Sequence, residues 1–278
     1  MTWIYAIPPW LLFISVIVAS AAVAGAGLLL VRRIVPQSDE LSHNDVAGPI
    51  IGTVGTILAV ILSFLLVMVW QEYDGAAATV AQEAGAVADL YHIGEYLPGS
   101  PAKNLRTTLK RYIDVVIDQE WPAMRFGRES MEARTTAFRA LSIVAHYQPR
   151  NSAEQSIQQS GLGLATTFID ARRDRLFANQ QGIPVFFWAG NFILAAITIG
   201  FCFIFRVRKV AVHLVMTIAL TTVIATIFVL IALFDYPFRG DTQIPPTVFI
   251  SLRQALNGEA IVSSLPSEPV RSQSSSAR

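Results

Sequence analysis

Four apolar blocks constrain this chain more than any other feature of its sequence. They run from Trp10 to Val31, Gly48 to Trp70, Ile183 to Phe205 and Val210 to Phe234, are 22 to 25 residues long, and contain no Lys, Arg, Asp or Glu. At about 1.5 Å of rise per residue, a helix of this length crosses the roughly 30 Å hydrocarbon core of a bilayer. A buried helix of a soluble protein would normally carry a polar stripe. We therefore expect an all-α membrane protein with four transmembrane helices.

The first block could also be a secretion signal, since Ala19 and Ala21 offer plausible cleavage sites. A signal peptide, however, carries positive charge before its apolar run. Residues 1–9 contain no Lys or Arg, whereas Arg32 and Arg33 follow the block. We expect the block to be retained as a membrane helix.

The charged residues gather between the second and third blocks. Residues 71–182 hold 12 of the 21 basic and 13 of the 20 acidic residues, and their periodicity predicts helices throughout. The last of these helices is expected to open at Ser152 with a capping box. The predicted segments are a first helix pair (1–70, spans about 10–31 and 48–70), a helical extramembrane domain (71–182), a second helix pair (183–235, spans about 183–205 and 210–234), a turn and short helix (236–262) and a disordered tail (263–278).

Composition excludes several classes of function. A net charge of +1 gives no basic face for DNA or RNA, so no nucleic acid partner is expected. The single Cys202 cannot form an internal disulfide, and no spaced Cys/His set indicates a metal site. No catalytic motif such as His-Glu-x-x-His or Gly-x-Ser-x-Gly is present, so we expect neither an enzyme nor a cofactor.

The second block carries the most informative pattern. Small residues fall within one arc of about 100° when the helix turns 100° per residue. We call them the small-residue face: Gly48, Gly52, Gly55, Thr56, Ala59 and Ser63. Small residues let a neighbouring helix approach closely, and small hydroxyl residues can also line a narrow pore. Both interpretations stay open, and an oligomer could use them at different depths. The candidate pore-lining residues are Gly52, Thr56, Ala59 and Ser63.

Other polar residues in the spans give weaker signals. Asn191 is expected to form a hydrogen bond between helices, because a polar group in hydrocarbon usually faces protein or water. His213 lies near the start of its span and is expected to be interfacial, with a proton-sensitive role as the alternative.

The absence of charge inside the spans disfavours coupled transport, because pumps and transporters normally place Asp, Glu, Lys or Arg in the membrane interior. A passive channel can select ions by charges at its mouths. Candidates for anions are Arg32, Arg33, Arg206, Arg208 and Lys209, and candidates for cations are Glu72, Asp74 and Glu83. Anchoring at the interface and solvated helix faces explain the same residues.

Several motifs are spread over about residues 41–250. They are His43-Asn44 leading to Gly48 and Gly52, Phe64 with Val69-Trp70-Gln71-Glu72-Tyr73, Glu83-Ala84, Leu90-Tyr91, Ala171-Arg172-Arg173-Asp174-Arg175-Leu176, Pro184 with Trp188, and Asp235-Tyr236-Pro237-Phe238-Arg239-Gly240. In these motifs the chain resembles the bacterial bestrophin-like-domain family. Bestrophins share the layout of two spans, a helical segment and two more spans. They are pentameric, mostly anion-conducting channels whose second span lines the pore. Two departures are that no neck can be matched position by position and that the acidic calcium clasp of animal bestrophins is not evident.

The resemblance also bears on orientation, which the charge rule leaves unsettled at five basic residues against five. Weighting the first helix would place residues 71–182 outside, whereas the resemblance implies the cytoplasm. We expect a multi-pass protein of the cell membrane, a homo-oligomer in the lipid bilayer that conducts small inorganic ions, more readily anions. The alternative is a non-conducting scaffold or sensor that binds a partner through the helical seam of Val80, Ala84, Val87, Tyr91 and Gly94.

Overall fold

The computed structural model is built from helices, and it contains no strand in the part of the chain that it describes: residue 5 and residues 7–34, 43–205, 207 and 209–264. The long helices are α1 (Pro9–Ile34), α2 (His43–Tyr96), α6 (Ser152–Gln180), α7 (Val185–Ile204), α8 (Val210–Phe234) and α9 (Thr247–Ser264). Shorter elements are α3 (Ser100–Val115), a π-helical turn (Val116–Glu120), α4 (Trp121–Met124) and α5 (Met131–Ala145). The predicted tail from residue 263 lies outside the described residues, apart from the last two residues of α9.

Four stretches are long and apolar enough to cross a membrane, namely Pro9–Ile34, Ala47–Tyr96, Ser152–Ile204 and Val210–Phe234. The expected all-α architecture with four membrane spans is therefore confirmed. Two of these stretches continue well beyond the apolar blocks, because α2 has no helix breaker after Trp70 and α6 runs on to the linker before α7. The exact membrane boundaries stay predictions.

The chain forms two compact units. The membrane unit comprises residues 1–80, 122–129 and 171–245, and the helical unit comprises residues 81–121, 130–170 and 246–278. The membrane unit thus takes in three stretches, 71–80, 122–129 and 171–182, that belong to the predicted extramembrane segment. Compactness and membrane depth are different properties, so this division leaves the predicted spans as they stand.

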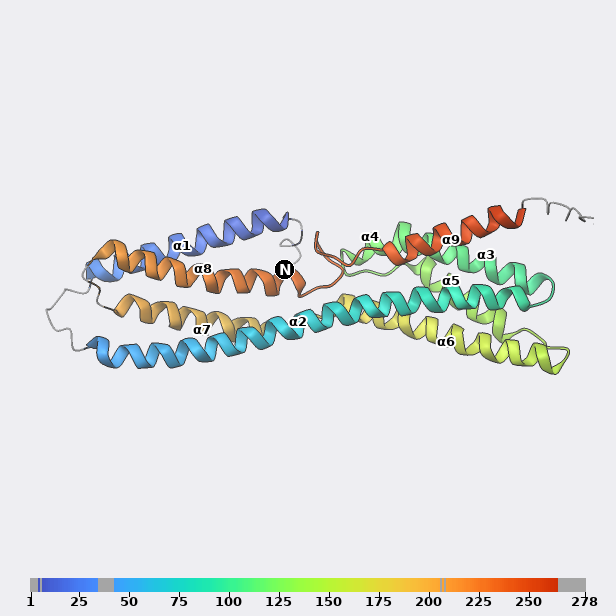
Figure 1. Cartoon of the computed structure of the whole chain (residues 1–278), viewed down its shortest axis with the longest axis horizontal. Helices are drawn as coiled ribbons and strands as arrows, with labels where there is room; N and C mark the ends of the chain where they lie inside the picture. The colour runs from blue at the N-terminus through green and yellow to red at the C-terminus, as the bar shows by residue number, and fades with distance from the viewer. Residues whose placement is uncertain (1–4, 6, 35–42, 206, 208, 265–278) are drawn as a thin grey trace, which may run out of the picture. The chain divides into compact units, whose positions relative to one another are not determined.

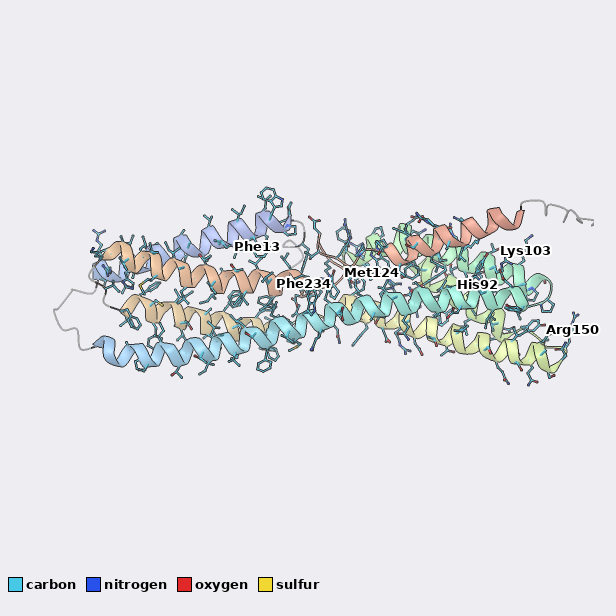
Figure 2. The ribbon with its side chains drawn as sticks, viewed as in Figure 1. Phe13, His92, Lys103, Met124, Arg150 and Phe234 are labelled. Atoms are coloured by element: carbon cyan, nitrogen blue, oxygen red, sulfur yellow. The ribbon has the colours of Figure 1, made fainter. Side chains whose placement is uncertain are left out.

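In the membrane unit, α1, α7, α8 and the first part of α2 lie side by side (Figure 1). Helix α2 contributes Leu58, Leu62, Leu65 and Val69 to a core that α7 and α8 complete with Ala195, Ile224, Phe228 and Ile231. A second cluster joins α1 to α8 through Leu12, Val229 and Leu233, and Phe13 and Phe234 pack against it (Figure 2). In lipid such contacts stabilise through close packing rather than through transfer from water.

In the helical unit, helix boundaries follow local chemistry. Ser130 caps α5 by accepting a hydrogen bond from the Ala133 amide at 3.3 Å. Helix α6 is capped by Asn151, whose Oδ1 accepts from the Glu154 amide at 2.9 Å while its Nδ2 donates to the Glu154 carboxylate at 3.3 Å. The helix begins at Ser152 as predicted, but its cap is Asn151 rather than Ser152. Asn151 and Glu154 satisfy the same three-residue spacing.

Candidate functional site: the second span and the turn that closes the membrane unit

Helix α2 presents three distinct faces within the membrane unit. Leu58, Leu62, Leu65 and Val69 form the packed face and are 1 to 6% exposed. The predicted pore-lining residues Gly52, Thr56, Ala59 and Ser63 are all exposed on the small-residue face. A Cβ atom added at Gly48, Gly52 or Gly55 would meet nothing within 4 Å. No helix in the described part of the chain therefore packs closely against these three glycines.

The third face of α2 is bulky and apolar. It carries Ile57, Phe64 and Met68, which are 48%, 70% and 45% exposed. Large apolar side chains suit contact with lipid or with a neighbouring chain. Since the packed face lies between the other two, the small-residue face and this large apolar face point in clearly different directions from one helix.

The hydroxyl groups of the small-residue face have defined donors and acceptors. Thr56 Oγ1 donates to the Gly52 carbonyl at 2.8 Å, and Ser63 Oγ donates to the Ala59 carbonyl at 2.7 Å. Each hydroxyl donates its proton to the backbone of its own helix, and its oxygen lone pairs stay available as acceptors at the exposed surface. The face can therefore bind water without leaving a polar group unpaired.

Aromatic side chains bound this face at one end. Trp70 is 54% exposed and lies about two helical turns beyond Ser63 on the same side of α2. Its ring centroid is 6.1 Å from Tyr73 and 5.5 Å from Phe234, and the Tyr73 hydroxyl donates to the Thr242 carbonyl at 3.0 Å. These contacts join α2 to the end of α8 and the turn that follows it.

Polar residues of α7 and α8 lie inside the membrane unit rather than on its surface. Asn191 is 3% exposed and donates from Nδ2 to the Phe187 carbonyl of its own helix at 2.8 Å. Its Oδ1 has no hydrogen-bond partner among the described residues. Within the described residues, Asn191 therefore does not form the bond between helices that was expected for it. Thr198, Thr217 and Thr221 are likewise buried and donate to carbonyls one turn earlier.

His213 is buried, 3% exposed, so its ring packs against protein, and its expected place at the membrane interface stays a prediction. Its Nε2 lies 2.8 Å from the Cys202 carbonyl, and its Nδ1 lies 3.0 Å from Arg32 Nη2. Because a carbonyl only accepts and a guanidinium only donates, these contacts place the proton on Nε2. Arg32 also donates to the Val207 carbonyl at 2.5 Å, so it ties the end of α1 to the α7–α8 connection.

The candidate mouth charges have different surroundings. Arg33 and Lys209 are exposed, as are Glu72 and Asp74. Glu83 is 0% exposed and accepts a hydrogen bond from Tyr112, so it is a buried structural group. Arg206 and Arg208 lie outside the described residues. Within the described part, no group of three His, Cys, Asp or Glu residues could hold a metal ion.

The segment after α8 closes the membrane unit. Asp235 accepts a hydrogen bond from the Ile183 amide at 2.6 Å, which fixes the linker between α6 and α7. The Arg239 guanidinium stacks 4.0 Å above the Tyr236 ring and donates to the Asn179 carbonyl at 3.3 Å. Gly240 turns the chain with a φ of 71°. The Asp235–Gly240 motif therefore holds the α6–α7 linker against the end of α8. The sequence singled out this motif without indicating its contacts.

Two features of these sites were missed from the sequence. The packed face of α2 follows the alternating four and three spacing of a helix-packing seam, and this signal was available in Leu58, Leu62, Leu65 and Val69. The contact between the Asp235 turn and the α6–α7 linker had no signal, because its partners lie 52 residues apart and meet through a backbone amide.

Comparison with known proteins agrees with the helical fold. A family model described as a bestrophin-like domain matches residues 18–249. A crystal structure of a bacterial bestrophin homologue from Klebsiella pneumoniae superposes with a TM-score of 0.64 at 10% identity, covering 90% of this chain and 100% of that chain. A crystal structure of a bacterial bestrophin homologue from Klebsiella pneumoniae with a point mutation superposes with a TM-score of 0.62 at 11% identity, covering 88% of this chain and 98% of that chain.

At these identities the structural matches show a shared fold. No sequence among curated proteins matches significantly. The family model, in contrast, covers most of the chain, including α2 and the Asp235 turn. The chain therefore belongs to the bestrophin-like domain family.

Proposed function

We propose that this protein is an oligomeric ion channel, more selective for anions, with the second span lining its pore. The observation that carries the proposal is the exposure of Gly52, Thr56, Ala59 and Ser63 on a helix whose other side is packed against α7 and α8. A small, hydroxyl-bearing face that its own chain leaves uncovered suits water or another chain beside it. A ring of identical chains around a water-filled axis would supply both.

The three faces of α2 suit such a ring. The packed face holds α2 onto its own chain, and the large apolar face suits lipid or the neighbouring chain. The small-residue face is then left for the axis. Ions would cross passively, since the four apolar blocks contain no charged residue that could couple transport to proton binding. No enzymatic activity and no cofactor are part of this proposal.

Anion preference rests on the bestrophin resemblance and on the exposed cations Arg33 and Lys209. The protein is proposed to reside in the cell membrane, with the helical unit in the cytoplasm. A cysteine introduced at the exposed Asn104 tests this orientation. A membrane-impermeant thiol reagent should label it only in inside-out vesicles, and labelling from the outside of intact cells would contradict it.

Conduction is tested with purified full-length protein reconstituted into planar bilayers. Ser63→Trp should reduce the unit conductance, because an indole ring would fill the axis at that depth. Phe64→Trp is the matched control, since it places the same side chain one residue away on the large apolar face. Equal currents from the two variants, or a correctly assembled oligomer with no conductance in any salt, would overturn the proposal.

The scaffold alternative gains no specific support. Its expected partner-binding seam is occupied within the chain, since Val80, Ala84, Val87 and Tyr91 are 0 to 2% exposed. A Cβ atom at Gly94 would lie 3.3 Å from Arg106 and 3.4 Å from Leu105, both of α3. This seam is therefore not free to bind a partner helix.

A further inference from the structure

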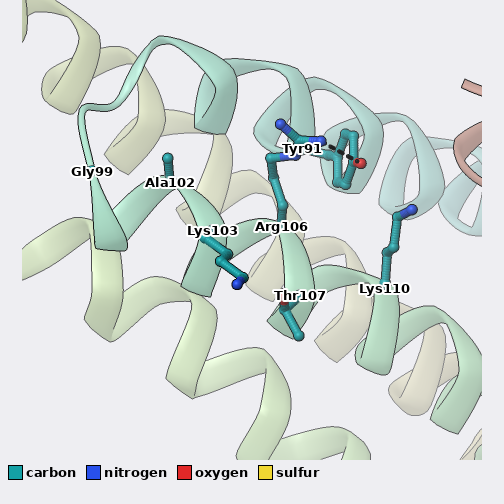
Figure 3. Close-up of a pocket in the computed structure, with 7 residues that line it drawn as sticks. All are labelled: Tyr91, Gly99, Ala102, Lys103, Arg106, Thr107 and Lys110. Atoms are coloured by element: carbon teal, nitrogen blue, oxygen red, sulfur yellow. Dashed lines mark hydrogen bonds between the residues drawn. The ribbon is translucent and has the colours of Figure 1, made fainter. Parts of the chain in front are cut away.

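The helical unit contains an open, basic pocket that the proposed channel activity does not use. One face of α3 and the end of α2 line an open hollow of about 350 Å³, whose residues are drawn in Figure 3. The lining residues are Tyr91, Gly99, Ala102, Lys103, Arg106, Thr107 and Lys110. This volume falls at the lower end of small-molecule sites, about 300–1,000 Å³.

The pocket is positively charged. Lys103, Arg106 and Lys110 recur at spacings of three and four, which places them on one face of α3. Residues 99–113 contain one further cation, Arg111, which is bound to Glu132, and no acidic residue. Among the described residues, the carboxylate paired with a pocket cation is Glu95, 3.8 Å from Arg106. Both partners are at least 40% exposed, so solvent screens this pair and leaves most of the positive charge available.

Two of the cations are held in place before any ligand arrives. The Arg106 guanidinium and the Lys110 ammonium lie 5.0 and 5.6 Å from the centroid of the Tyr91 ring and flank it (Figure 3). Arg106 also donates to the Tyr91 hydroxyl at 3.2 Å, and Lys110 donates to the Leu256 carbonyl at 3.1 Å. A preorganised site loses less conformational entropy on binding than a flexible one.

The remaining polar groups are uncommitted. Lys103 and Thr107 are exposed, and neither side chain has a hydrogen bond or ion pair among the described residues. The amino end of α3 lies at the same pocket and adds positive potential. A merely solvated basic face would not combine a concave surface, two fixed cations and one free cation.

The chemistry of these groups selects the ligand class. A planar guanidinium beside two ammonium groups matches an oxyanion with several charges. Tyr91 is 2% exposed and covered by cations, so the pocket offers no free aromatic face for a base or ring. We propose that this pocket binds the phosphate groups of a di- or triphosphate anion. A soluble polyphosphate and a phosphorylated lipid headgroup share this chemistry.

The first arm of the test uses full-length protein in nanodiscs of phosphatidylcholine, titrated with inorganic triphosphate in a calorimeter. Binding should saturate at one anion per chain, and Lys103→Gln should weaken it by at least about tenfold, as expected for loss of a charge-assisted contact. Lys103 has no structural partner, so the variant should fold. Arg139→Gln removes the same charge from an exposed site elsewhere in the unit and should leave the affinity unchanged.

The second arm adds phosphatidylinositol phosphate to the nanodiscs and counts retained lipid by native mass spectrometry. If a headgroup is the ligand, lipid retention should fall in Lys103→Gln and not in Arg139→Gln, while triphosphate competes poorly. Dependence on Lys103 in either arm supports the site and identifies its source of phosphate. Absence of Lys103-dependent binding in both arms, or equal weakening by Lys103→Gln and Arg139→Gln, would overturn the proposal.

Discussion

Gly182 lies so close to the ring of Tyr236 that a Cβ atom at position 182 would overlap the ring. The contact joins the linker between α6 and α7 to the turn that follows α8. Asp235 reinforces the same junction through the Ile183 amide. The start of α7 and the end of α8 therefore both depend on Gly182, because its lack of a side chain leaves room for the Tyr236 ring.

Gly182→Ala should destabilise the folded protein by about 1–3 kcal/mol, the usual cost of forcing extra volume into a packed site. The thermal midpoint of the full-length protein in detergent, followed by size-exclusion chromatography, measures the effect. Gly163→Ala is the control, because a Cβ atom there meets nothing within 4 Å and alanine favours the helix. A Gly182→Ala midpoint equal to that of the control would show that the Tyr236 ring moves aside freely.

The sequence was sufficient for the fold because hydrocarbon tolerates so few charges that uncharged blocks mark the spans. It was not sufficient for the internal arrangement. All three faces of α2 are uncharged, and polarity alone does not distinguish a side packed on protein from a side facing lipid or water. The spacing of Leu58, Leu62, Leu65 and Val69 carried that information instead.

Asn191 illustrates a second limit on prediction from sequence. Its amide was expected to bond to another helix, yet it donates to Phe187, one turn earlier in α7. The carbonyl four residues back is always within reach of a short polar side chain, whereas a partner on another helix depends on rotation about the helix axis. Sequence therefore indicates that such a residue is buried more reliably than it indicates its partner.

In the helical unit, Tyr112→Phe should be markedly destabilising. The Tyr112 hydroxyl donates to Glu83, both residues are 0% exposed, and the ring packs edge-on against Phe168 at 4.7 Å. Phenylalanine keeps the ring but removes a donor from a buried carboxylate, at an expected cost of about 1–3 kcal/mol. Tyr96→Phe is the matched control, since Tyr96 is 70% exposed. The prediction fails if the two variants unfold at the same temperature.

The ionised Glu132 carboxylate should stabilise the helical unit near neutral pH, and this stabilisation should be lost in acid. Hydrogen bonds from Gln119 and then from Arg111 lower the pKa of this carboxyl below its usual value of 4.5. A lowered pKa in the folded state stabilises the protein above the unfolded pKa, and this stabilisation is lost as pH falls through the folded value. The thermal midpoint of wild type should exceed that of Glu132→Gln near neutral pH, and the gap should narrow as pH falls from about 5 toward 3.

Asp89→Asn controls for loss of a carboxylate as such, because Asp89 is exposed in the same unit and has no ion pair among the described residues. A gap between wild type and Glu132→Gln that stays constant across the acid range would show that the Glu132 contacts do not depend on its charge.

Asp74 is expected to oppose anion flow in the proposed channel. It is exposed and lies about one turn beyond Trp70, on the side of α2 that carries Thr56 and Ser63. Repeated in each subunit, it would place a ring of negative charge at one mouth. Asp74→Asn should therefore raise anion permeability relative to cation permeability by a few fold. The reversal potential across a KCl gradient measures this ratio, and the change should shrink at high salt as mobile ions screen the ring.

The control for this prediction is Glu72→Gln, which removes the same charge two residues away, on a different side of the helix. If Glu72→Gln shifts the reversal potential as much as Asp74→Asn does, the small-residue face is not the side of α2 that faces the ions.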